Sequence, residues 1–151
     1  MCGIFGLIHG QQEVHLKDLI IANRAIAMRG PERSHYIHSD SYTLAFHRLA
    51  INGLSPAKDQ PYVYSDDIHH FYLLCNGEIY NAMELYKTVL GLDWVDGMSD
   101  TQVIYDLWKH WDYDFTKLNA ELLGEYALAI LVCDHRDKPT ELYISTDYIF
   151  S

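Results

Sequence analysis

Residues 126–133, Tyr-Ala-Leu-Ala-Ile-Leu-Val-Cys, form a strongly apolar run that predicts a strand. The polar residues 134–139 predict a turn after it, and residues 141–145 alternate well enough to be the hairpin partner. Residues 42–51 form a second strand-like run that is apolar at most positions. Two sheets packed on each other explain why both runs are so apolar, because one face of each strand then meets the other sheet.

The rest of the chain adds strands and helices in runs. Residues 2–9 and 68–75 predict two further strands. Asn81 is the expected cap of one helix, and Ser99 followed by Gln102 matches a capping box that opens another. The predicted helices cover residues 16–28, 81–90, 99–111 and a short segment from Thr116 that Gly124 closes. This order favours a layered α+β fold over a doubly wound parallel sheet.

The composition is that of one globular domain. The chain has 151 residues, of which 49% are hydrophobic and 13% aromatic, so it can bury a core and is not a disordered segment. Eleven basic residues against 21 acidic ones give a net charge of −10, which argues against nucleic acid as a partner. No apolar run approaches the ~20 residues that cross a bilayer, and no signal peptide is apparent. We therefore expect no membrane association and a cytoplasmic location.

The cysteines and histidines do not predict a metal site or a disulfide. The three cysteines are widely spaced, whereas a disulfide framework or zinc site needs pairs. Cys75 and Cys133 each close an apolar run, where a thiol behaves as a small hydrophobic side chain. The histidine pairs lack Cys, Asp or Glu partners at ligand spacing, and no phosphate-binding GxxxxGK[ST] loop occurs.

Cys2 differs from the other cysteines because it precedes its apolar run. If Met1 is removed, Cys2 carries a free α-amine beside its own thiol. One residue then supplies both the nucleophile and the base, as in enzymes with an amino-terminal threonine. A cysteine after the initiator methionine is often incidental, so this feature alone does not decide the function.

The segment Asn76-Gly77-Glu78 follows directly on the strand predicted at 68–75. Asn and Gly at a strand end form a tight turn by default. Alternatively, the Asn76 amide and the Gly77 backbone N–H point at one spot and hold the oxyanion of a tetrahedral intermediate. Glycine suits that role because the backbone must approach a ligand closely.

Arg48 lies within an otherwise apolar strand, and a buried guanidinium is costly unless it is paired. It is therefore in a structural ion pair or binds a ligand carboxylate. Glu78 and Asp100 are two further candidate carboxylates. Asp100 also has a simpler explanation, since an acidic side chain in the first turn of a helix complements the helix dipole.

Read together, these segments resemble the class II glutamine amidotransferases over nearly the whole chain. The motifs are Met-Cys-Gly-Ile-Phe-Gly at 1–6, Arg-Gly-Pro-Glu at 29–32, His-Arg-Leu-Ala-Ile at 47–51, Gln-Pro at 60–61, Asn-Gly-Glu-Ile-Tyr-Asn at 76–81, Ser-Asp-Thr at 99–101 and Gly-Glu-Tyr-Ala-Leu-Ala at 124–129. The second and fifth of these are similar to the asparagine synthetase branch of that family. The resemblance implies the four-layer αββα sandwich of the amino-terminal-nucleophile hydrolases.

The resemblance also implies a catalytic apparatus and a reaction. Cys2 is the expected nucleophile, and Asn76 with the Gly77 amide is the expected oxyanion hole. Glutamine is hydrolysed through a Cys2 thioester to glutamate and ammonia, which serves amide synthesis such as that of asparagine. No cofactor is expected in this domain, since ATP and magnesium belong to the synthetase domain of such enzymes.

Substrate binding is likewise assigned by the resemblance. Arg48 is expected to bind the α-carboxylate of L-glutamine, helped by backbone groups of Ile51 and Asn52. Glu78 and Asp100 are expected to receive the α-ammonium group. One cation for the carboxylate and two anions for the ammonium agree with the charges of the ligand.

Two departures from the family pattern bear on function. Glu32 stands where the family usually has Asp, and residues 145–150, Ser-Thr-Asp-Tyr-Ile-Phe, lack the Arg and Gly that normally flank the Asp in this loop. We expect one glutaminase domain over residues 1–151 without the synthetase domain, which would act in cis or in trans. A homodimer is left open.

Two other functions compete with an active glutaminase. One is a catalytically idle regulatory or interaction domain that keeps the fold. The other is a hydrolase of the same fold that acts on a different amide. The intact set of candidate site residues argues against the first, and the paired acids with Arg48, suited to an α-amino acid, argue against the second.

Overall fold

The structure is a computed structural model that describes residues 2–10, 12, 14–49 and 59–147. Along the chain its elements are β1 (Gly3–Ile8), α1 (Leu16–Ala27), β2 (Arg33–His38), β3 (Tyr42–Arg48), β4 (Tyr62–Ser65), β5 (His69–Ile79), α2 (Ala82–Thr88), the 3₁₀ helix η2 (Asp100–Gln102), α3 (Val103–His110), α4 (Phe115–Glu121), β6 (Gly124–Asp134) and β7 (Pro139–Thr146). Among the described residues, no helix is long and apolar enough to cross a membrane.

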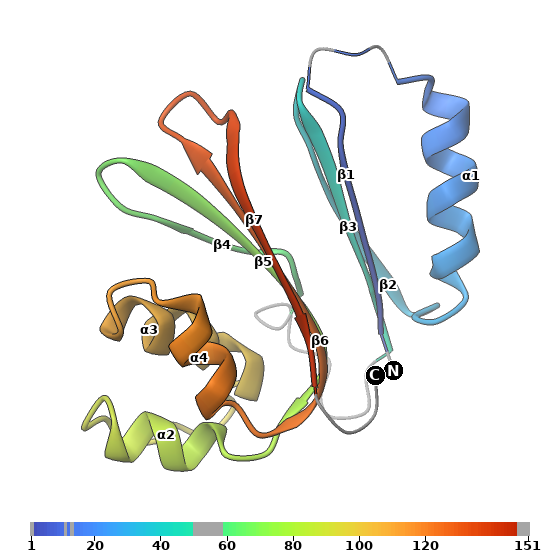
Figure 1. Cartoon of the computed structure of the whole chain (residues 1–151). Coiled ribbons are helices and arrows are strands. Elements are labelled where there is room, and N and C mark those ends of the chain that lie inside the picture. Colours follow the sequence, from blue (N-terminus) through green and yellow to red (C-terminus); the bar gives the residue numbers. More distant parts are fainter. Residues whose placement is uncertain (1, 11, 13, 50–58, 148–151) are drawn as a thin grey trace.

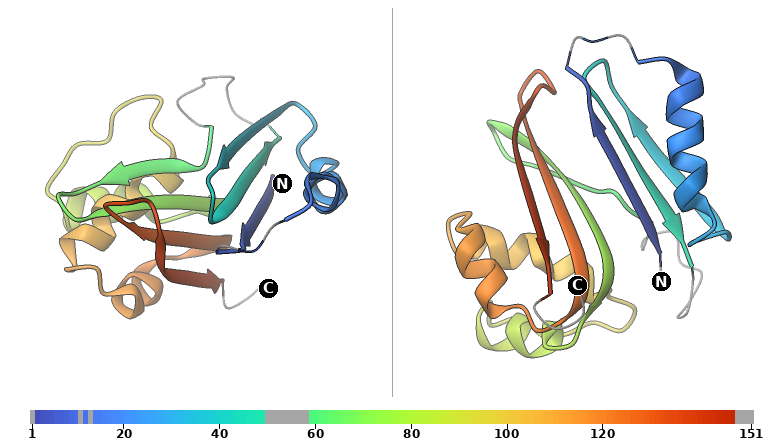
Figure 2. Two further views of the ribbon diagram at one scale, coloured as in Figure 1. Left: turned by 90° about the horizontal axis from the view of Figure 1, so that it is seen from above. Right: turned by 45° about the vertical axis from the view of Figure 1, so that its right-hand side comes forward.

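Two antiparallel sheets form the centre of the molecule. The amino-terminal sheet has the strand order β1-β3-β2, and the carboxy-terminal sheet has the order β4-β5-β6-β7. The sheets face each other, with α1 on the outer face of the first and α2, α3 and α4 on the outer face of the second (Figure 1). The turned views in Figure 2 show the same succession of layers. The predicted α+β sandwich with αββα layers is confirmed.

In the carboxy-terminal half, β4–β7 with α2–α4 and η2, the central strands β5 and β6 are buried on both faces over most of their length. Along β6, Leu128, Ile130 and Val132 pack towards the helices, whereas Leu131 and Cys133 pack towards the other sheet. Successive side chains of a strand point to opposite faces, so a strand buried on both sides must be apolar throughout. This explains the continuous apolar run at residues 126–133.

The amino-terminal half, β1–β3 with α1, is buried mainly on the face towards the other sheet. Tyr42, Leu44 and Phe46 of β3 contribute to the core between the sheets. On the opposite face, the fully buried His47 meets Asn23 of α1 through Nε2 and Ser34 of β2 through Nδ1, both at 2.8 Å. Polar contacts thus help to hold α1 on the outer face of this sheet, whereas apolar packing holds the inner face against the other sheet.

Several sequence-based boundaries need correction. The strands β2 and β4 were not predicted from the sequence, because β2 is polar and mostly exposed and β4 has only four residues. The predicted turn at Asn76–Gly77 is wrong, since β5 runs on through both residues to Ile79 and pairs them with Ala127 and Tyr126.

The helix ends also differ in detail. Asp114, rather than Thr116, opens α4, where its side chain accepts a hydrogen bond from the Lys117 N–H (2.9 Å). Gly124 begins β6 instead of closing that helix. Ser99 and Gln102 do form the expected contact, because the Ser99 N–H donates to Gln102 Oε1 (2.9 Å). The helix they open begins as η2 and continues as α3.

Candidate active site

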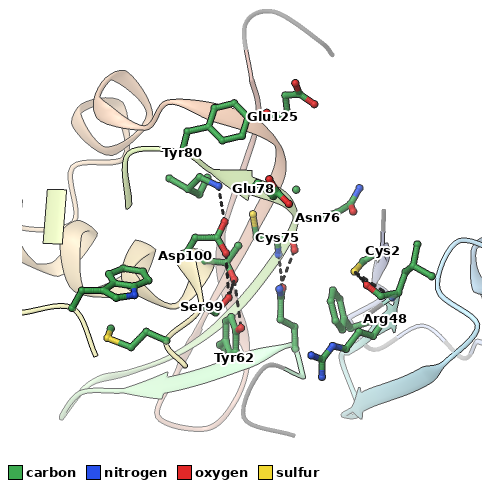
Figure 3. A pocket seen from close by; sticks show the side chains of 18 residues that line it. Cys2, Arg48, Tyr62, Cys75, Asn76, Glu78, Tyr80, Ser99, Asp100 and Glu125 are labelled. Atoms are coloured by element: carbon green, nitrogen blue, oxygen red, sulfur yellow. Dashed lines mark hydrogen bonds between the residues drawn. The ribbon is translucent and has the colours of Figure 1, made fainter. Parts of the chain in front are cut away.

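A cavity of about 670 Å³ lies at the end of the sandwich where the start of β1, the end of β3 and the end of β5 meet η2. Six of the eight predicted site residues line it: Cys2, Arg48, Asn76, Gly77, Glu78 and Asp100. Cys2 directly precedes β1, Arg48 ends β3, Asn76 to Glu78 lie in β5, and Asp100 lies in η2 (Figure 3). The other two predicted residues, Ile51 and Asn52, lie outside the described residues.

Cys2 is half-buried directly before β1, and its sulfur lies against the end of β3. The Leu49 N–H donates to the Cys2 sulfur at 3.5 Å, and the Arg29 side chain donates to the Cys2 carbonyl at 3.3 Å. The next residue, Gly3, pairs with His47 in β3. Backbone pairing of the next residue and these two hydrogen bonds, one to the sulfur and one to the carbonyl, therefore hold Cys2 in place at the wall of the cavity.

Asn76 and Gly77 form the part of the cavity wall that β5 supplies, where both residues pair with β6. Gly77 has a φ of 145°, and a Cβ on this residue would collide with the Glu125 carbonyl oxygen of β6. Glycine is thus required for close strand packing, independently of any ligand. The Asn76 Oδ1 is shielded from solvent and has no hydrogen-bond partner among the described residues. A shielded amide oxygen without a donor costs free energy that a donor on a ligand can recover.

Arg48 forms an ion pair at the wall of the cavity. It is buried, lines the cavity, and its Nη1 donates to Asp59 Oδ1 at 3.0 Å. Arg33 donates to the other oxygen of Asp59 at 2.7 Å. Burial disfavours ionisation of Asp59, but the hydrogen bonds from Arg33 and Arg48 outweigh it and lower the pKa of this carboxyl. The structural ion pair predicted as one alternative is therefore present.

Acidic side chains form the opposite wall. Glu78 lies directly across from Glu125 in the pairing of β5 with β6, and both line the cavity. Like charges in directly opposite positions repel, which a cation between them would relieve. Asp100 is half-buried in the first turn of η2, and its Oδ2 accepts the Ile79 N–H at 2.6 Å. That bond fixes the carboxylate against the end of β5.

The two other cysteines are unsuited to nucleophilic chemistry. Cys75 and Cys133 are 2% and 0% exposed, which confirms the predicted core positions. Burial raises the pKa of both thiols, that of Cys133 to about 12, so both stay protonated near neutral pH. Among the described residues, no group of three or more His, Cys, Asp or Glu side chains could hold a metal ion.

Several cavity residues received no role from the sequence. Gln60 lies in the Gln-Pro motif and lines the cavity, and the preceding Asp59 holds Arg48. Trp94 and Met98, from the segment between α2 and η2, add an apolar wall. The adjacency of an acid to the Gln-Pro motif was a usable signal for Asp59, whereas nothing in the local pattern distinguishes Trp94 or Met98.

The divergent segment near the end of the described chain keeps a structural acid. Asp147 is buried, its N–H donates to the Tyr126 carbonyl (3.0 Å), and its Oδ2 accepts the Tyr126 N–H (3.2 Å). Asp147 thus ties the end of β7 to the start of β6, one residue from Glu125. The rest of that segment, residues 148–151, lies outside the described residues.

Comparisons with known proteins point to one family. The family model of the glutamine amidotransferase domain matches residues 1–147. Similar curated proteins include asparagine synthetase (glutamine-hydrolyzing) 1 of Bacillus subtilis strain 168, 28% identical over 86% of this chain and 20% of the relative. The corresponding protein 1 of Arabidopsis thaliana is 33% identical over 91% of this chain and 22% of the relative. The asparagine synthetase (glutamine-hydrolyzing) of Sandersonia aurantiaca is 36% identical over 72% of this chain and 20% of the relative.

The chain thus spans about a fifth of the length of these curated relatives. The family match, by contrast, extends over nearly the whole of this chain and includes every described residue that lines the cavity. On the fold, the cavity and this match, the chain belongs to the glutamine amidotransferase domain family.

Proposed function

We propose that this domain hydrolyses L-glutamine to glutamate and ammonia, with Cys2 as the nucleophile after removal of Met1. The observation that carries the proposal is the cavity, which gathers a half-buried cysteine, an amide, one cation and a set of carboxylates from separate elements. An α-amino acid with a side-chain amide needs this combination. The relatives, named as glutamine-hydrolyzing asparagine synthetases, support glutamine as the substrate.

In the proposed binding mode, Arg48 takes the α-carboxylate of glutamine, with backbone groups of Ile51 and Asn52. A guanidinium has five donors, so it can hold Asp59 and a second carboxylate at once. Glu78 and Asp100 take the α-ammonium group. The Glu78–Glu125 pair favours this orientation, because the ammonium group offsets the repulsion between two opposed carboxylates.

In the proposed reaction, the Cys2 sulfur attacks the side-chain amide carbon while the α-amine of Cys2 takes the thiol proton. The Asn76 amide and the Gly77 N–H hold the oxyanion. The protonated α-amine returns the proton to the leaving nitrogen, which departs as ammonia and leaves a γ-glutamyl thioester. Water then attacks the thioester, glutamate leaves, and the thiol is restored.

We further propose that the ammonia serves amide synthesis by an asparagine synthetase domain, present in cis or in trans, which would use ATP and magnesium. A cytoplasmic location fits that role. The chain itself has no phosphate-binding GxxxxGK[ST] motif. Without the synthetase domain, we expect glutamate release that neither ATP nor aspartate stimulates, and strong stimulation by ATP would contradict this coupling scheme.

The direct test is an assay of glutamate release by the protein whose amino terminus is Cys2. Cys2→Ala should abolish release, whereas the matched variant Cys133→Ala, at a buried thiol between the sheets, should retain it. If the wild-type protein binds glutamine but releases no glutamate, the idle regulatory domain becomes the better account.

A further inference from the structure

Gln60 makes an unusual pair of contacts with β5. Its Nε2 donates to the Cys75 carbonyl at 3.0 Å, and its Oε1 accepts the Cys75 N–H at 2.6 Å. The side chain is buried, with the residue only 4% exposed. An amide that both donates to and accepts from one residue reproduces the two bonds that an antiparallel strand exchanges with its neighbour.

The sheet explains why a side chain is needed at this point. β4 begins at Tyr62, which pairs with Leu73 of β5, so Gln60 lies opposite Cys75 if the register continues. Pro61, between Gln60 and Tyr62, has no backbone N–H to donate. The Gln60 side chain therefore continues the ladder beyond the end of β4 and holds β5 up to the residue before Asn76.

Asp59, the preceding residue, reaches in the other direction. Its carboxylate accepts hydrogen bonds from Arg48 and Arg33, both of the amino-terminal sheet. Two adjacent residues thus fix opposite walls of the cavity: Asp59 holds the guanidinium of Arg48, and Gln60 holds the strand that carries Asn76 and Gly77.

We propose that Asp59 and Gln60 are positioning residues for glutamine hydrolysis, Asp59 for substrate binding and Gln60 for the oxyanion hole. This inference rests on the proposed glutaminase function. Gln60 acts through the Cys75–Asn76 backbone, so its loss affects the transition state more than the bound substrate. Asp59 acts through Arg48, whose guanidinium it holds at the wall of the cavity.

The kinetic test separates the two residues. Gln60→Met keeps the volume of the side chain but loses both bonds to Cys75, and it should lower kcat about 10- to 100-fold with little change in KM. Asp59→Asn keeps the shape but loses the charge, and it should raise KM about two- to tenfold with kcat unchanged.

Asn81 supplies a matched control for a merely structural effect. Its amide also makes two bonds to backbone, donating to the Glu121 carbonyl (2.8 Å) and accepting the Leu123 N–H (2.9 Å), but it does not line the cavity. Asn81→Leu should lower the melting temperature without changing kcat or KM. If Gln60→Met behaves in the same way, Gln60 supports only the fold and the proposal is wrong.

Hydrogen exchange of the Cys75 backbone amide, followed by NMR, tests the positioning without any catalysis. Gln60→Met should speed this exchange about tenfold or more, because the N–H loses its partner, whereas Asp59→Asn and Asn81→Leu should leave it unchanged. Unchanged exchange in Gln60→Met would overturn the inference. A wild-type protein that releases no glutamate would instead overturn the proposed function, and the exchange result would still decide whether Gln60 holds the strand.

Discussion

The two halves of the sandwich are built in different ways, although each pairs a sheet with an outer helical layer. In the carboxy-terminal half, Val103, Leu107 and Trp108 of α3 are at most 1% exposed and pack on the sheet. In the amino-terminal half, no described side chain of α1 is fully buried, and Ile20 and Ile21 are 41% and 58% exposed. The carboxy-terminal half is held by its apolar core, whereas the amino-terminal half is held mainly by strand pairing and polar contacts.

This difference bears on the proposed chemistry because the nucleophile and the oxyanion groups lie on different halves. Asn76, Gly77 and Asp100 stand on the densely packed half, whereas Cys2 and Arg48 stand on the half with the thinner core. We infer that the densely packed half is the fixed frame of the site. The alignment of Cys2 with it then depends on a few polar contacts at the end of β3.

The largest difference between the halves should appear in stability. Trp108→Ala removes a buried ring that contacts Phe71, Tyr113 and Tyr143, and it should lower the free energy of unfolding by about 3–5 kcal/mol. Ile20→Ala, on the exposed face of α1, should cost no more than about 0.5 kcal/mol. Urea unfolding measures both. Equal losses would mean that α1 is packed as tightly as α3.

The next effect concerns the two arginines that share Asp59. Arg48→Ala should weaken glutamine use by about 30- to 1,000-fold, because a charge-assisted contact worth about 2–4 kcal/mol is lost. Arg33→Ala is the matched control, since Arg33 bonds the same carboxylate but is about half exposed and does not line the cavity. It should have little effect on kcat/KM.

Stability measurements on the same two variants complete the comparison of the arginines. If Arg48→Ala melts far below wild type while its folded fraction keeps normal kinetics, Arg48 is only a structural residue of the amino-terminal half. The proposed carboxylate site would then have to be placed elsewhere in the cavity.

A smaller effect should appear as a pH dependence of the amino-terminal half. Burial lowers the pKa of His47 from its ordinary 6.5, so the unfolded chain takes up a proton more readily than the folded one. The contribution of neutral His47 is therefore full above pH 6.5 and decreases as the pH falls from there towards the lowered value. Wild type should lose more stability than His47→Gln between pH 7.5 and 5.5. Parallel stability profiles would show that His47 does not link α1 and β2 to β3 in this way.

The sequence predicted those parts of the molecule whose local pattern of apolar residues is clear. The apolar runs at 42–51 and 126–133 predicted two strands, and two packed sheets explained both runs, which was sufficient for the layered fold. The strand β2 was missed because its exposed polar residues are ordered by hydrogen bonding to β3, a contact that local sequence does not encode. Asn76–Gly77 was expected as a turn for a similar reason, since pairing with β6 keeps it in a strand.

The site residues also divide into those that the local sequence predicts and those that depend on distant contacts. Six predicted residues converge because motif spacing and strand ends place them at one end of the sandwich. The roles of Asp59 and Gln60 escaped the sequence because each acts through a partner distant in the chain: Asp59 through Arg33 and Arg48, Gln60 through Cys75. The catalytic and binding roles assigned to the cavity residues stay predictions until they are measured.

The central claim is that Cys2, at the mature amino terminus and on the thinly packed half, is the nucleophile for glutamine. Intact-mass analysis after treatment with a glutamine analogue that alkylates thiols tests it most directly. The account predicts a protein without Met1 that carries one adduct, located on Cys2 and prevented by excess glutamine. Labelling confined to Cys75 or Cys133, or full glutaminase activity in Cys2→Ala, would contradict it.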